Sequence, residues 1–296
     1  MEQFEKMGKG IYFLKVPFGP VWTAVVLVRG AENMLIDSAA TARDVDDYVV
    51  PALAQLGLAP ADIHWLLNTH CHGDHIGGHR RFWELSGCRV AAFDKAAPKV
   101  ENPVPYAIRI RTTFPAYSPA PQSYLQGVPV DKILADGEVF GDLRVINTPG
   151  HDNDCLCWYH IPTGTLITGD SLQANGTICQ GVGFYQDLNS YEKGLNRLLG
   201  MDIENILCGH DYDGIGWHIE GKAAVRKALE KCVSYIGAYH AYIKEHAYLE
   251  DPAEIAQALI RDLGCGKPEQ LFMALYTVTQ HLERIKEEQS KRAKTY

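Results

Sequence analysis

The chain has 296 residues, enough to bury a sizeable core in one large domain or in one domain with an appendage. Its formal net charge of −8 at pH 7 disfavours non-specific attraction to nucleic acid or to an anionic membrane. The first six residues are charge-rich and lack the apolar core of a secretory signal, and no apolar run is long enough to span a bilayer. We therefore expect a cytoplasmic protein that contacts no membrane.

The first hundred residues alternate strand-like and helix-like patterns. Short segments rich in β-branched and aromatic side chains predict strands at residues 10–16, 21–28, 33–37, 63–68 and 88–93. Gly, Pro and Asn separate the first three, which indicates an antiparallel meander. Residues 41–56 carry apolar side chains at helical spacing before Gly57, and a second helix is expected up to about residue 86. Interspersed strands and helices predict a layered α/β fold.

A polar loop follows the fourth predicted strand directly. Its sequence His70-Cys71-His72-Gly73-Asp74-His75 places three imidazoles and one carboxylate within six positions. In an extended segment His70 and His72 point the same way, so both can reach one cation. Asp74 and His75 fall where the chain turns into a helix, which directs them to a neighbouring point. Crowding four such groups without a cation has no energetic compensation, so the loop predicts two adjacent metal positions rather than a solvated turn.

Residues 94–130 form an insertion of different character. Seven of the 15 prolines of the chain lie here, which disfavours regular structure over most of the segment. A long irregular insertion in an enzyme is often a lid. Its cations would let such a lid hold an anionic group of a substrate, and a solvated surface loop with incidental charges is the alternative. These cations are Lys95, Lys99, Arg109 and Arg111.

One arrangement recurs three times later in the chain. A short buried-type strand leads through glycine to a single ligand-type residue, at His151, at Asp170 and at His210. Glycine lets the backbone turn sharply and leaves space beside an ion. One case alone would be a weak signal. Together with the first loop, these segments supply five histidines and two aspartates, which suits two divalent cations.

The combination of HxHxDH, TPGH, GD and GH motifs at these residues resembles the metallo-β-lactamase superfamily, in its glyoxalase-II-like branch. The resemblance covers about residues 10–218 and implies an αββα sandwich with a dinuclear site at one edge, between the two sheets. It implies one ion on His70, His72 and His151, and a second on Asp74, His75 and His210, with Asp170 bridging. Zinc is the expected metal, and iron and manganese are alternatives.

Two features depart from relatives within this superfamily. Several class B β-lactamases have a cysteine where Asp170 falls, which disfavours antibiotic hydrolysis. The loop after His151 reads Asp152-Asn153-Asp154 instead of continuing TPGH with Thr, so substrate contacts there do not carry over. Asp152 and Asp154 either orient a histidine or are plain loop carboxylates.

The chemistry expected of such a site is hydrolysis. Two metals about 4 Å apart would share a bridging hydroxide that cleaves a small ester, thioester or lactone. Asp74 is the candidate for moving a proton to the leaving group. Tyr185 and Tyr212 are candidates for hydrogen-bonding a substrate oxygen, unless they simply pack. A phosphodiesterase or nuclease on the same ions and a mononuclear-iron persulfide dioxygenase are the enzymatic alternatives, and a non-enzymatic scaffold is the other.

The remaining residues, 219–296, predict a helical C-terminal extension of a catalytic domain at 1–218. Apolar stripes indicate helices near residues 225–243, 252–263 and 271–285, and Asp251-Pro252 caps the second. Such extensions close over the substrate or mediate a homodimer in glyoxalase-II-like relatives. A winged-helix-like module is the alternative for these three helices.

Overall fold

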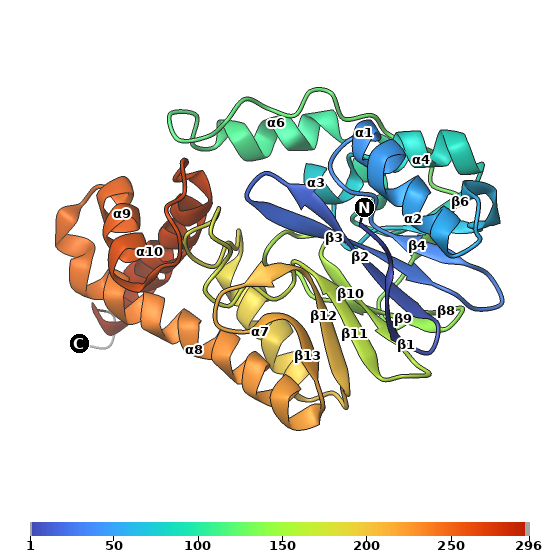
Figure 1. Ribbon diagram of the computed structural model, residues 1–296. Helices are drawn as coiled ribbons and strands as arrows, with labels where there is room; N and C mark the ends of the chain where they lie inside the picture. Colours follow the sequence, from blue (N-terminus) through green and yellow to red (C-terminus); the bar gives the residue numbers. More distant parts are fainter. Residues whose placement is uncertain (1, 294–296) are drawn as a thin grey trace.

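The computed structural model describes residues 2–293 and places two β-sheets against each other, with helices on both outer sides (Figure 1). This is the αββα arrangement expected from the sequence. The first sheet contains, in spatial order, β1 (Glu5–Gly8), β2 (Ile11–Phe18), β3 (Val21–Val28), β4 (Met34–Ile36), β5 (Trp65–Leu67), β6 (Arg89–Phe93) and β7 (Lys132–Leu134). The second contains β13 (Gly216–Glu220), β12 (Asn205–Tyr212), β11 (Thr165–Gly169), β10 (Leu156–His160), β9 (Leu143–Asn147) and β8 (Val139–Phe140).

The helices fall into three groups along the chain. The first group is α1 (Ala42–Asp44), η1 (Val45–Val49), α2 (Val50–Gln55), η2 (Pro60–Asp62), α3 (Gly73–Ile76) and α4 (His79–Ser86). The insertion holds α5 (Ala97–Glu101) and α6 (Val104–Thr112). The last group is α7 (Leu188–Leu199), α8 (Lys222–His246), η3 (Ala247–Leu249), α9 (Pro252–Leu263) and α10 (Phe272–Ala293).

The first sheet begins with the predicted meander. Strands β2, β3 and β4 pair antiparallel, and β4 to β7 then pair parallel through helical crossovers. The last six residues of β3 are all buried, because this strand contacts β12 of the second sheet on its inner side. The carboxyl ends of β4 and β5 therefore meet the other sheet at one edge of the sandwich, where the polar loop after β5 begins.

The helix predicted over residues 41–56 is interrupted. Thr41 caps α1 by accepting a hydrogen bond from the Asp44 amide, but a π-helical turn, η1, separates α1 from α2. Pro51 explains the interruption, because it has no N–H to donate to the carbonyl four residues earlier and its ring would crowd that carbonyl.

The insertion is more regular than its proline content predicts. Its two helices each carry proline in the first turn, Pro98 in α5 and Pro105 in α6, where the missing N–H has no helical partner in any case. Residues 113–130 form neither helix nor strand, in agreement with the sequence. In Figure 1, α6 lies across the top of the molecule, above the gap between the first sheet and α10.

The C-terminal helices lie close to their predicted positions; α8 packs onto the second sheet, and α9 and α10 pack against α8. Buried side chains of α8 and α10, such as Leu229 and Val278, share one core with Ile206 of β12. The predicted boundary after residue 218 falls inside β13. No helix among residues 2–293 combines the length and apolar character needed to cross a membrane.

Candidate metal centre

The loop after β5 presents four ligand-type side chains at the edge of the sandwich. The backbone of His72 is extended and ends the loop by capping α3, whose first turn contains Asp74 and His75. His70 and His75 are fully buried, and Asp74 is partly open to solvent. The extended run and the following helical turn thus separate the four side chains into two directions, as the spacing predicts.

Side chains from the second sheet complete two groups of three. In the first group, His70, His72 and His151, one ligand atom from each lies within 4.8 Å of the others. The His151 Nε2 atom is only 2.9 Å from Nδ1 of His72.

The second group comprises Asp74, His75 and His210, again within 4.8 Å of one another. The Asp74 Oδ2 atom lies 3.2 Å from His210 Nε2 and 3.6 Å from His75 Nε2. His210 lies inside β12 rather than after its end, so the strand carries this ligand directly.

Asp170 lies between the two groups. Its Oδ1 is 3.3 Å from His75 Nε2, and its Oδ2 is 3.5 Å from His151 Nε2 and 3.4 Å from His210 Nε2. One carboxylate thus faces ligands of both groups, which is the position of a bridging ligand. Gly209 is required beside it, because a Cβ at that position would come within 2.5 Å of Asp170 Oδ1.

The ring nitrogens that face away from the centre are held by hydrogen bonds. His75 Nδ1 lies 2.8 Å from Asp37 Oδ2, His151 Nδ1 lies 2.8 Å from the carbonyl of Phe184, and His210 Nδ1 lies 2.6 Å from the carbonyl of Trp22. Such partners orient an imidazole and leave its other nitrogen free for a cation.

The sequence predicts none of these three partners. Asp37 follows the buried strand β4 and so fits the same strand-then-acid pattern as Asp170, which is a signal that was available. The two carbonyls, of Trp22 and Phe184, carry no sequence signal, because every residue has one.

The unpaired atoms of the centre fit a cation. Among the described residues, His70 Nε2, His75 Nε2 and Asp170 Oδ1 are buried without a hydrogen-bond partner. Orphaned acceptors of this kind are costly unless a ligand satisfies them. Nitrogen and carboxylate donors in this number suit zinc, iron or manganese.

The histidines of the centre differ in the direction of their pKa shifts. Burial lowers the pKa of His151 to about 3, and burial with the neighbouring His75 lowers that of His70. Both rings are therefore neutral near pH 7, the form that binds metal. The pKa of His210 is instead raised to about 10, because the effect of the Asp170 and Asp74 carboxylates exceeds the opposing effect of burial.

The loop after His151 is tied to the insertion. Lys99 of α5 donates to Asp152 Oδ1 at 2.7 Å and to Asp154 Oδ1 at 2.9 Å, and both carboxylates are buried. The other oxygen of Asp152 lies 3.5 Å from His72 Nε2. Asp152 is therefore more than a plain loop carboxylate, because it pairs with Lys99 and its other oxygen faces a histidine of the first group.

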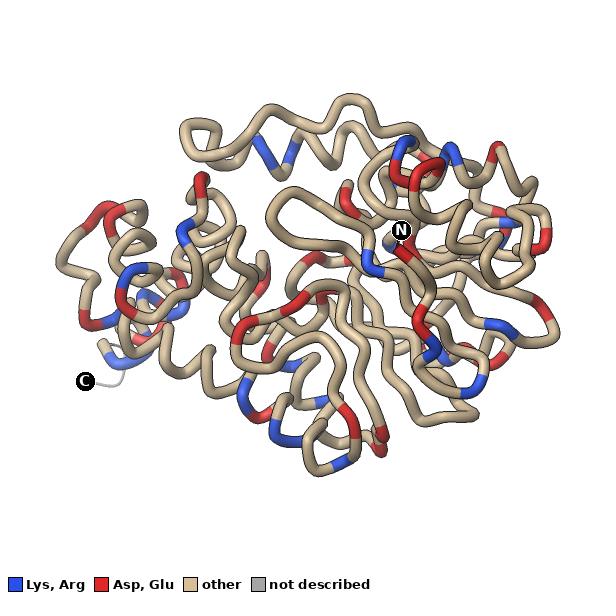
Figure 2. Tube along the Cα trace, in the orientation of Figure 1, with Lys and Arg blue, Asp and Glu red and all other residues tan. Residues whose placement is uncertain are grey.

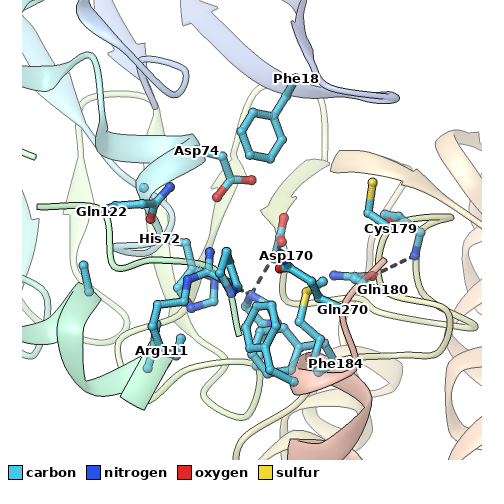
Figure 3. A pocket seen from close by; sticks show the side chains of 18 of the residues that line it. Phe18, His72, Asp74, Arg111, Gln122, Asp170, Cys179, Gln180, Phe184 and Gln270 are labelled. Atoms are coloured by element: carbon cyan, nitrogen blue, oxygen red, sulfur yellow. Dashed lines mark hydrogen bonds and ion pairs between the residues drawn. The ribbon is translucent and has the colours of Figure 1, made fainter. Parts of the chain in front are cut away.

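A cavity of about 270 Å³ opens beside the centre (Figure 3). His72, Asp74, His151, Asp170 and His210 contribute to its inner wall. The other walls come from four segments: the β2–β3 hairpin with Phe18 and Val21, the insertion with Ile110, Arg111 and Gln122, the loop after β11 with Cys179, Gln180 and Phe184, and the start of α10 with Phe272 and Met273.

The structure does not bring the two candidate tyrosines to this cavity. The Tyr185 hydroxyl lies 2.6 Å from His281 Nε2 in the helical extension, and the Tyr212 hydroxyl accepts a hydrogen bond from Gln173. Both side chains are about 1% exposed, and neither lines the cavity. Their positions match the packing alternative, because each hydroxyl has a partner inside the protein.

Comparison with known proteins identifies the family. Residues 17–210 match the sequence model of the Metallo-beta-lactamase superfamily, and this stretch contains all seven side chains of the centre. The chain belongs to this superfamily. Its structural similarity extends to a metallo-beta-lactamase family protein from Thermus thermophilus, with a TM-score of 0.74 and 24% identity over 96% of this chain and 95% of that one.

Relatives in the superfamily carry different names. The Beta-lactamase-like protein 2 homolog of Drosophila melanogaster is 26% identical over 275 residues, 89% of this chain and 81% of that protein. The Hydroxyacylglutathione hydrolase of Methylococcus capsulatus is 27% identical over 191 residues, 61% of this chain. The match spans 63% of that hydrolase, less than two thirds of its length.

Proposed function

We propose that this chain is a dinuclear zinc-dependent hydrolase that cleaves a small ester, thioester or lactone. The observation that carries the proposal is the position of Asp170, whose two oxygens face histidines of both three-residue groups at 3.3 to 3.5 Å. A single iron would need only the first group and one carboxylate. The second group, Asp74, His75 and His210, favours two ions over one.

Each ion has its own set of protein ligands in this proposal. His70, His72 and His151 would hold one ion, Asp74, His75 and His210 the other, and Asp170 both. When bound, the two ions supply Lewis acidity and lower the pKa of a shared water. The fixed outer nitrogens of the histidines keep the ligand atoms in place without reorganisation during the reaction.

We assign the role of proton carrier to Asp74. Burial opposes its ionisation, but His75 and His210 outweigh burial and lower the pKa of this carboxyl group below its usual range. Asp74 lines the cavity, so its ionised carboxylate can accept a proton from the attacking water and pass it to the leaving oxygen or sulfur.

The cavity supports a small substrate rather than a nucleic acid. Phe18, Ile110, Phe272 and Met273 contribute apolar walls, and within residues 2–293 Arg111 is the one lysine or arginine that lines it. Basic and acidic positions are interspersed over the visible face of the molecule in Figure 2, without the continuous basic stripe expected of a nucleic-acid interface. The hydroxyacylglutathione hydrolase relative makes thioesters the first class to test.

The test combines metal content with turnover. Purified protein is analysed for bound metals and assayed on matched thioester, ester, lactone and phosphodiester substrates. Two equivalents of zinc with hydrolysis of an acyl substrate is the expected result, and Asp170→Ala should lower the bound zinc and abolish most of the turnover. One iron with oxygen uptake, or hydrolysis confined to the phosphodiester, would overturn the proposal.

A further inference from the structure

The four cations of the insertion have different roles in the folded chain. Lys99 is neutralised by Asp152 and Asp154, and Lys95 and Arg109 are exposed. Arg111, in the last turn of α6, lines the cavity beside the metal centre. Only Arg111 is therefore positioned to meet a bound molecule.

Arg111 has no polar partner within residues 2–293. It forms no ion pair or hydrogen bond there, and its Nε is buried without a partner. Its guanidinium carbon lies 4.3 Å from the centre of the Phe272 ring, at the start of α10. This cation–π contact supplies no hydrogen-bond acceptor, so the N–H donors of the guanidinium have no protein partner there. An anion from a ligand would satisfy those donors.

Apolar side chains make up much of the cavity around Arg111, and its uncharged polar side chains away from the metal ligands include Gln122, Gln180 and Gln270. Phe18 and Val21 come from the β2–β3 hairpin, Ile110 from α6 itself, and Met273 from α10. Figure 3 shows Arg111 and Gln122 on one side of the pocket, with Cys179 and Gln180 opposite. A ligand that fills this space needs a negative group at α6 and an apolar body between α6 and the hairpin.

We propose that Arg111 binds a carboxylate of the substrate, so that the substrate is an ester or thioester with an apolar body and a carboxylate remote from the bond that is cleaved. This inference rests on the proposed hydrolase function and names its substrate class. A planar guanidinium edge matches a carboxylate with two parallel hydrogen bonds.

The reaction leaves the remote carboxylate unchanged. Water adds its oxygen to the acyl carbon, the bond from that carbon to the ester oxygen or thioester sulfur breaks, and the leaving group departs with a proton as an alcohol or thiol. Arg111 only positions the substrate by holding one end while the acyl bond lies at the inner wall.

The kinetic test compares two thioesters of equal length, one ending in a carboxylate and one in the neutral primary amide. The wild-type enzyme should prefer the carboxylate substrate in kcat/KM. Arg111→Gln should lower kcat/KM for the carboxylate substrate by about 10- to 100-fold, mainly through KM, and leave the amide substrate unchanged. Arg111→Lys should retain part of the preference. Arg109→Gln, on the same helix but exposed, is the control and should change neither substrate.

Direct binding separates this inference from the hydrolase proposal. Calorimetric titration of the metal-free and zinc-loaded protein with 3-phenylpropionate measures the subsite whether or not any ester is cleaved. Wild-type binding that Arg111→Gln loses in both forms supports the subsite even if no ester turns over. An Arg111→Gln variant that binds 3-phenylpropionate as the wild type does, or that slows both thioesters equally, overturns the proposal. A phosphate-ended thioester that outperforms the carboxylate would also overturn it.

Discussion

Asp37 contacts Thr69 and His75 on the side of the candidate metal centre that faces away from the cation positions. Its replacement tests whether these contacts contribute to stability and metal binding. Its carboxylate accepts hydrogen bonds from the backbone N–H and the hydroxyl of Thr69, each at 2.8 Å, and lies 2.8 Å from His75 Nδ1. Asp37→Ala leaves the Thr69 amide and the His75 ring N–H buried without a partner. At about 1 to 3 kcal/mol for each unsatisfied group, the free energy of unfolding should fall by about 2 to 6 kcal/mol.

The same change should weaken metal binding. Without Asp37, the His75 ring loses its fixed orientation, and loss of such a support costs about 10- to 100-fold in metal affinity. Urea unfolding of the metal-free protein measures the first effect, and zinc titration against a chromophoric chelator measures the second. Asp131→Ala is the control, because Asp131 accepts the Val90 N–H at 2.8 Å between β6 and β7 and is no part of the centre. It should lower stability and leave zinc affinity intact. An Asp37→Ala protein that binds two zinc ions with wild-type affinity would refute the reasoning.

Three further outcomes are expected. Lys99→Met should lower the free energy of unfolding in urea by about 3 to 5 kcal/mol, because the buried Asp152 carboxylate loses its cation. Lys95→Met, at an exposed position, is the control and should change this free energy by less than about 0.5 kcal/mol. Equal effects of the two variants would contradict the buried pairing. Tyr185→Phe should lower the free energy of unfolding by about 1 kcal/mol and leave kcat/KM unchanged. A tenfold loss of turnover would instead indicate that the Tyr185 hydroxyl takes part in the reaction. Burial lowers the pKa of His281 from 6.5 to about 3, so the unfolded chain gains a proton on acidification before the native chain does. The stability from this residue is complete above about pH 6.5 and is lost toward pH 3, at up to about 1.4 kcal/mol per pH unit, and His281→Gln should flatten that part of a urea stability profile.

The sequence by itself determined the fold class and the residues that meet at the candidate metal centre. Imidazole and carboxylate chemistry belongs to the side chain, so crowding within residues 70–75 is visible without a structure. The later strands each bring one ligand through glycine to the same edge, as Asp170 and His210 illustrate, and this repetition made the family recognisable. The apolar periodicity of residues 41–56 predicts one continuous helix, because this pattern depends on side chains and does not show that Pro51 lacks a backbone N–H.

Only the tertiary structure decided what surrounds the residues of that centre. Asp37 lies 38 positions from His75, and the Trp22 carbonyl lies 188 positions from His210, so no local pattern joins these partners. The cations Lys99 and Arg111 are equivalent candidates in the sequence. Packing of the insertion against the loop after His151 buries the first, and the start of α10 leaves the second facing the cavity. The identity of a side chain is local, whereas its partner is set by which distant segments the two sheets bring together.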